Sequence, residues 1–165
     1  MRKPLQFMKI RSNKKRPLPN IYGGVRVHTN KPPSHHQGWD LLAPPGTPVF
    51  AIASGQAKAG YSKDYGNWIS IKFAHRGQTL YAFYAHLLRY SDNVVAQNQT
   101  VPEGTVIGFT GRSGNAQEIP LAESHLHFEI RTKEVPSSPS LLGTGLNGRI
   151  DPGQVLGYEI YSSSL

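Results

Sequence analysis

The sequence predicts an all-β fold, in which antiparallel sheets form a sandwich or an open, barrel-like arrangement and long loops border a groove. Short alternating or apolar runs recur about every 8–12 residues between turn-forming residues, without helical periodicity. The 165 residues include 17 glycines and 13 prolines, so turns should be frequent and long helices rare. A chain of this length is expected to form one domain with a real core.

Strands are expected throughout the body of the chain. Ile69, Ile71 and Phe73 alternate with polar residues, and this period of two is typical of a strand with one buried face. The turn residues at 76–78 predict a hairpin between this strand and the next. The expected strands are two within 49–61 and one each at 67–75, 79–88, 106–111 and 125–131.

Two long loops interrupt this pattern, at Arg112–Ser124 and Lys133–Arg149. Loops of this length within a compact domain are often functional. The loops are therefore expected to border the groove.

Positive charge is concentrated at the start of the chain. The net charge is +8, and the first 16 residues contain seven lysines and arginines and no acid. We predict a basic arm at residues 1–20 and a single domain at residues 21–165. The arm could bind nucleic acid, anionic lipid or anionic cell-wall polymer, or serve only as a disordered, solubilising tail. The strands carry few basic residues, which disfavours a nucleic-acid-binding β-domain.

Composition excludes several other classes. The chain contains no cysteine, so disulfides and thiolate metal sites are excluded, and any metal must use His, Asp or Glu. No apolar run approaches the length of about 18 residues that a transmembrane helix needs. The basic N-terminal stretch lacks the apolar segment of a Sec signal.

The stretch ESHLHFEIR, residues 123–131, places His125 and His127 on one face of a predicted strand. Residues i and i+2 lie about 7 Å apart along a strand, so both imidazoles can serve one site. The polar face of a solvated edge strand would show the same pattern. Glu129 follows on the same face, either as a hydrogen-bond acceptor for a ligand histidine or as an exposed carboxylate.

A second cluster, SHHQGWD, contains His36 and Asp40. Flanking prolines oppose a helix, and on a straight strand the two residues would lie about 13 Å apart. A bend at Gly38 would bring them together. With His125 or His127 they would form the set of three N/O ligands that is typical of catalytic zinc.

A third histidine lies in the run YAFYAHLL. His86 follows Tyr84 by two residues, which puts both on the same face of a regular strand. Taken alone, a histidine beside aromatic residues is more often a semi-buried structural residue than a catalytic one.

The three motifs are H-x-G-x-D, Y-x-H and H-x-H-F-E, and their order resembles the lysostaphin-type (LytM-like) zinc endopeptidases, which cleave peptide cross-links in bacterial peptidoglycan. The similarity extends to GWDLLAPPGTPVFAIASGQA, YGNWISIKFAH, VPEGTVIGFTGRSG and RIDPGQVL. It covers about residues 21–157.

The resemblance implies a Zn2+ ion bound by His36, Asp40 and His127. It also implies that His125 and His86 are catalytic, one as general base and the other as stabiliser of the oxyanion. The remaining histidines, His28, His35 and His75, match no motif of the family.

The resemblance implies a metalloendopeptidase that acts on peptidoglycan in the periplasm or cell wall, here predicted as a monomer. The segment NAQEIPLAE, longer than usual in the family, and the neighbouring Arg112, Arg131 and Lys133 favour D-Ala–meso-diaminopimelate cross-links over glycine bridges. Such a link carries a free carboxylate that an arginine can bind.

Two further expectations concern its biology. The alternative function is a non-catalytic wall-binding or amidase-activating module of the same fold, which the complete ligand set disfavours. Because no Sec signal is visible, we also predict export by a dedicated apparatus, as an antibacterial effector with a cognate inhibitor protein.

Overall fold

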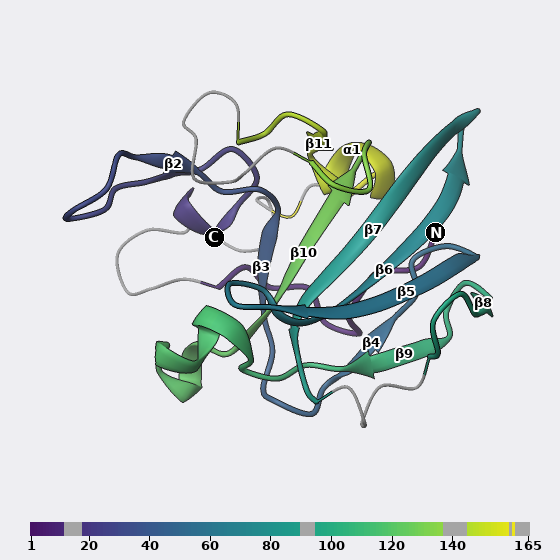
Figure 1. The fold of residues 1–165 in the computed structure, drawn as a ribbon, viewed down its shortest axis with the longest axis horizontal. Helices are drawn as coiled ribbons and strands as arrows, with labels where there is room; N and C mark the ends of the chain where they lie inside the picture. The colour runs from purple at the N-terminus through teal and green to yellow at the C-terminus, as the bar shows by residue number, and fades with distance from the viewer. Residues whose placement is uncertain (12–17, 90–94, 137–144, 159, 161–165) are drawn as a thin grey trace.

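The computed structural model describes residues 1–11, 18–89, 95–136, 145–158 and 160, and its strands pair antiparallel throughout (Figure 1). The predicted all-β class is therefore confirmed. Part of the predicted loop Lys133–Arg149 lies outside the described residues. No helix in the described ranges is long and apolar enough to cross a membrane.

A seven-stranded sheet forms the body of the molecule, in the order β11-β10-β7-β6-β5-β8, with β3 also paired to β10. Its strands are β3 (Trp39–Leu42), β5 (Gly55–Ser62), β6 (Gly66–His75), β7 (Gln78–Leu87), β8 (Thr100–Val101), β10 (His125–Arg131) and β11 (Arg149–Ile150). The strands predicted at 67–75, 79–88 and 125–131 correspond to β6, β7 and β10.

Two small sheets and several short helices complete the fold. One sheet pairs β1 (Val25–Arg26) with β2 (Ser34–His35), and the other pairs β4 (Pro48–Phe50) with β9 (Val106–Phe109). The 3-10 helices are η1 (Leu18–Asn20), η3 (Gly114–Glu118) and η4 (Leu121–Glu123), and the α-helix is α1 (Pro152–Leu156). Both η3 and η4 lie within the segment predicted as a loop at 112–124.

The hydrophobic core joins residues of the large sheet to residues of the β4–β9 pair, the N-terminal segment and α1. Leu126, Phe128 and Ile130, the predicted apolar face of β10, are fully buried there. Tyr84 from β7 packs against Phe128 with ring centroids 5.2 Å apart, and its hydroxyl accepts a hydrogen bond from the Ile52 amide at 3.0 Å. The opposite face of β10 is thereby free to carry polar residues.

The predicted hairpin between β6 and β7 is confirmed. His75 pairs with Gln78, so Arg76 and Gly77 form a two-residue turn. Both have positive φ, 49° and 75°, as the primed turns of tight hairpins require.

The first eleven residues do not behave as a free arm. Leu5 and Ile10 are only 2% and 3% exposed and belong to the core. The Lys9 carbonyl accepts a hydrogen bond from the Leu42 amide at 2.7 Å, beside β3. Of the alternatives left open for the basic arm, a disordered tail does not describe residues 1–11, because this segment buries apolar side chains between its charged ones. Lys14, Lys15 and Arg16 lie outside the described residues.

Candidate metal centre

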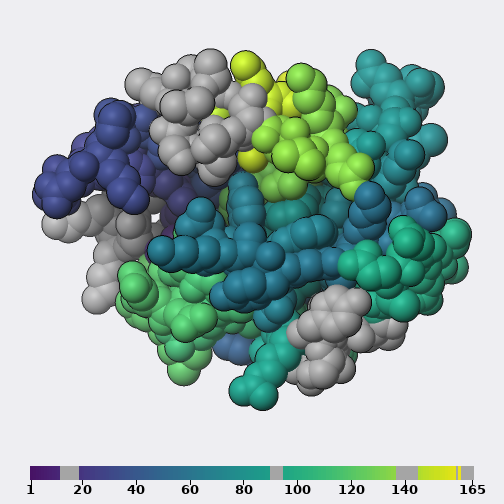
Figure 2. Space-filling view, in the orientation of Figure 1, coloured from purple at the N-terminus to yellow at the C-terminus, as the bar shows by residue number. Residues whose placement is uncertain are grey.

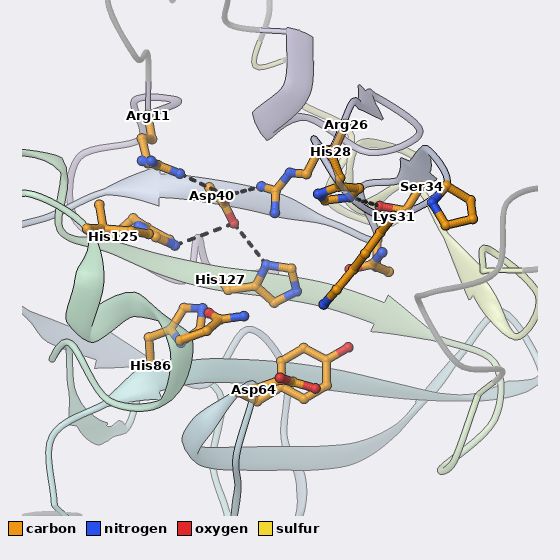
Figure 3. Close-up of a pocket in the computed structure, with 15 residues that line it drawn as sticks. Arg11, Arg26, His28, Lys31, Ser34, Asp40, Asp64, His86, His125 and His127 are labelled. Atoms are coloured by element: carbon orange, nitrogen blue, oxygen red, sulfur yellow. Dashed lines mark hydrogen bonds and ion pairs between the residues drawn. The ribbon is translucent and has the colours of Figure 1, made fainter.

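Strand β10 brings polar residues of distant segments together, because it lies between β3 and β7 (Figure 1). His127 is opposite Asp40 on β3 and opposite Ala85 on β7. In Figure 3 the side chains of Asp40, His125 and His127 converge on one point. All of them are at most 4% exposed.

Among the described residues, one group of side chains has the spacing of a metal site: His36, Asp40 and His127. Asp40 Oδ1 lies 3.0 Å from His36 Nε2 and 2.9 Å from His127 Nδ1. The two histidine nitrogens are 3.2 Å apart. Ligands about 2.0–2.1 Å from a tetrahedral zinc ion lie about 3.3 Å from one another. The observed triangle therefore fits zinc with little movement.

Hydrogen bonds behind the two histidines orient the nitrogens that face this point. His36 Nδ1 lies 3.1 Å from the Ile21 carbonyl, an acceptor, so Nδ1 carries the proton and Nε2 presents its lone pair. His127 Nε2 lies 2.9 Å from Glu129 Oε1, which leaves Nδ1 facing Asp40. Burial lowers the pKa of His36 to about 4, which keeps it neutral as a ligand must be. Burial opposes a charge on His127, but its hydrogen bonds to Asp40 and Glu129 raise its pKa, so a proton on Nδ1 takes the place that a cation would fill. Three ligand atoms thus meet at one point, which favours a cation there.

Glu129 is the anchor of this arrangement and is fully buried. Its carboxylate accepts hydrogen bonds from His127 Nε2, from the Tyr65 hydroxyl at 2.9 Å, and from Nε of Arg131 and Arg149 at 2.7 and 2.8 Å. Burial opposes ionisation, but Arg131 foremost and the hydrogen bond from His127 hold its pKa well below the usual range. Of the two interpretations open from sequence, an acceptor behind a ligand is the one observed, and the exposed carboxylate is excluded.

The local sequence explains how His36 and Asp40 meet. Strand β2 ends at His35 and β3 begins at Trp39, so the expected break falls around Gly38. A Cβ on Gly38 would lie 2.1 Å from the Phe128 carbonyl oxygen. Glycine is therefore needed for close approach to β10, which fixes the positions of the residues on either side of it.

His86 and His125 line the same pocket and pack edge to face, with ring centroids 5.1 Å apart. Nδ1 of His86 lies 2.9 Å from the Ser113 carbonyl, and Nδ1 of His125 lies 3.1 Å from the Glu123 carbonyl. Each ring therefore holds its proton on Nδ1 and leaves Nε2 able to accept another. Burial lowers the pKa of His86 to about 3 and also lowers that of His125, so both are neutral near pH 7.

The sequence predicted that Tyr84 and His86 share one face of a regular strand, and the structure differs. Tyr84 lies in the core whereas His86 faces the site, so the two do not share a face. The pairing of β6 with β7 shifts here, and Ala85 and His86 together oppose Trp68. His86 has φ of 60°, so this β-bulge turns its side chain over.

A pocket of about 330 Å³ opens above the metal centre, and Figure 3 shows its charged lining. Arg11 and Arg26 both approach Asp40 Oδ2, at 3.7 and 2.6 Å. Lys31 lines one wall, and Asp64 lines the pocket as well. Sequence reasoning missed these four residues, because they belong to no motif and come from short segments without a clear period.

The three cations predicted to bind substrate do not line this pocket. Arg112 donates to the carbonyls of Gln117 and Ile119 within its own segment. Arg131 binds Glu129 and stacks 3.4 Å from the centre of the Phe83 ring. Lys133 is exposed elsewhere. We therefore do not assign substrate binding to them.

Known proteins share both the sequence and the fold. Residues 34–139 match the model of peptidase family M23. The chain is 30% identical over 154 residues to the peptidoglycan DD-endopeptidase ShyC of Vibrio cholerae, covering 87% of this chain and 31% of that protein. It is 40% identical over 105 residues to the DD-carboxypeptidase/endopeptidase Mpg of Neisseria meningitidis, covering 63% and 22%. The chain thus spans less than a third of these relatives.

Among solved structures, the catalytic domain of the antimicrobial peptidase lysostaphin from Staphylococcus simulans is 25% identical, with a TM-score of 0.56 and coverage of 92% of this chain and 89% of that one. The matched family segment contains the predicted metal ligands and the two predicted catalytic histidines, His86 and His125. The resemblance noted in the sequence is thereby confirmed: this chain belongs to peptidase family M23.

Proposed function

We propose that the protein is a zinc-dependent endopeptidase that hydrolyses peptide cross-links in bacterial peptidoglycan, at the bond between D-Ala and meso-diaminopimelate. One observation carries this proposal. Three potential ligand atoms of His36, Asp40 and His127 lie within 3.2 Å of one another, and two neutral histidines, His86 and His125, open onto the same pocket. A hydrolytic zinc site needs these parts: three protein ligands, an open position and a proton acceptor.

The residues of this chain would divide the work as follows. Zinc, when bound, lowers the pKa of a water molecule and polarises a carbonyl. His86 and His125 each present an unprotonated Nε2, so either could accept a proton from the attacking water and donate it to the leaving amine. Because both rings rest with the proton on Nδ1, the one that is not the base would need to take up a second proton, on Nε2, before it could stabilise the developing oxyanion. Glu129, through His127, keeps a ligand nitrogen aimed at the metal.

The choice of bond is supported by the relatives. The names of ShyC and Mpg both describe D,D-endopeptidase activity. A pocket with cationic side chains on its wall suits a cross-link that carries a carboxylate. The site of action follows from the substrate, which lies outside the cytoplasm.

Digestion of purified walls tests this function. Peptidoglycan with direct D-Ala–meso-diaminopimelate links should release monomeric muropeptides, identified by mass, whereas the His36→Ala variant should release none. Cleavage confined to walls with glycine bridges would reverse the bond assignment. No release of peptides from either wall by the zinc-loaded protein would refute the proposal.

The alternative, a non-catalytic module, is less well supported, since such a module needs neither the ligand triangle nor the two neutral histidines. The effector role, the cognate inhibitor, the export route and the monomeric state have no counterpart in the fold or in the comparisons, and they stay predictions.

A further inference from the structure

The hairpin of β1 and β2 extends to one side of the domain and carries Lys31 over the pocket. In Figure 2 this dark blue hairpin and the green segment of η3 and η4 lie on the same side of the molecule. Figure 3 shows the Lys31 side chain reaching from the hairpin toward His127. No partner for Lys31 Nζ exists among the residues that the structure describes. The ammonium is therefore available to a ligand.

The other two cations of the pocket are already engaged. Arg26 binds Asp40 Oδ2 at 2.6 Å and donates from Nε to the Pro19 carbonyl at 3.0 Å. Arg11 binds Glu123 at 2.8 Å. These contacts neutralise Asp40 and hold the wall in place, and they leave Lys31 as the cation of this pocket that is open to substrate.

We propose that Lys31 binds the carboxylate that lies next to the scissile amide in a D-Ala–meso-diaminopimelate link. This inference rests on the proposed function. The amide nitrogen of that link is attached to a carbon that bears a free carboxylate, so the charge lies only a few bonds from the reacting carbonyl. A lysine that reaches toward the metal centre can contact it, and a flexible stem with a compact charge suits this task. A glycine bridge carries no such group.

A pair of synthetic cross-linked peptides tests the role of Lys31. The two differ only in this group, which is a free carboxylate in one and a primary amide in the other. The zinc-loaded protein should cleave the carboxylate form with roughly tenfold higher kcat/KM, as expected for one charge-assisted hydrogen bond. Lys31→Ala should abolish this preference through KM, and Lys31→Glu should reverse it. Lys72→Ala, an exposed lysine of β6 outside the pocket, serves as the matched control and should retain the preference.

Each result is decisive. Equal cleavage of both peptides by the unmodified protein would overturn the role of Lys31 and leave the proposed function intact. An unchanged preference in Lys31→Ala, with zinc content also unchanged, would do the same. Cleavage of neither peptide, together with release from glycine-bridged walls, would overturn both.

Discussion

Glu129 Oε1 and His127 Nε2 lie 2.9 Å apart at the buried end of the metal centre, on the side of the imidazole that faces away from Asp40. The hydrogen bond fixes the ring so that Nδ1, rather than Nε2, faces the other two ligand atoms. Because Arg131 and Arg149 keep Glu129 ionised, the acceptor is a charged one. The candidate metal site is therefore supported from β11, through Arg149, as well as from β10.

Replacing Glu129 should weaken metal binding without removing a ligand. We expect Glu129→Gln to lower zinc affinity about 10–100-fold, because an amide orients His127 less strongly than a carboxylate. Competition with a chromophoric chelator measures this, with circular dichroism to verify folding. Glu134→Gln is a matched control, since Glu134 is exposed and paired with Lys58 at the surface. Equal affinities in the two variants would show that Glu129 does not orient the ligand.

Metal binding and proton transfer should separate by mutation. His86→Ala and His125→Ala should keep stoichiometric zinc and lose about 10²–10⁴-fold in kcat, since each removes a proton-transfer or oxyanion group. His36→Ala and Asp40→Ala should lose the metal itself. Elemental analysis and turnover on the same samples distinguish the two classes.

The same measurements on a histidine outside the pocket serve as the control for these variants. His75→Ala should change neither quantity, because His75 lies at the far end of β6 and outside the pocket. Near-normal turnover in His125→Ala would contradict the assignment of that residue to catalysis.

A methyl group at position 38 should disturb both ligands that flank it. Gly38→Ala would place Cβ 2.1 Å from the Phe128 carbonyl oxygen, so either β3 or β10 must move. We expect a loss of about 1–3 kcal/mol in the free energy of unfolding, typical of overpacking, and weaker zinc binding. Denaturant unfolding with and without zinc measures both effects. Unchanged stability and affinity would mean that the contact relaxes without cost.

Zinc should stabilise the fold. The proposed ligands come from the β2–β3 connection, β3 and β10, so a bound ion would link segments far apart in sequence. Zinc at about 100 times its Kd should add about 2.7 kcal/mol to the stability, if the unfolded chain does not bind it. Thermal melting before and after chelation, followed by re-addition of zinc, measures this increment. His36→Ala should show no increment, and a full increment in that variant would place the stabilising ion elsewhere.

The sequence allowed correct prediction of the strands that have a clear hydrophobic period and of the residues that lie in recognisable motifs. The alternation in 67–75 and 125–131 predicted β6 and β10 with the correct buried faces. It did not reach features that depend on tertiary pairing. The bulge at His86 needs a positive φ that no local pattern signals. The role of Arg26 is visible only once the fold places it 2.6 Å from Asp40 Oδ2. In residues 1–11, the high density of charge gave no sign that Leu5 and Ile10 would be buried.

The course of those first residues has a consequence for self-association. Strand β3 pairs with β10 along one edge, and the backbone of Lys9, Ile10 and Arg11 lies along the other. An uncovered edge of this kind offers amides and carbonyls to a neighbouring molecule and promotes aggregation. The N-terminal segment thus covers the free edge of β3, the strand that carries Asp40. Its removal would expose unpaired backbone groups beside the candidate metal centre, to which a neighbouring molecule could bind.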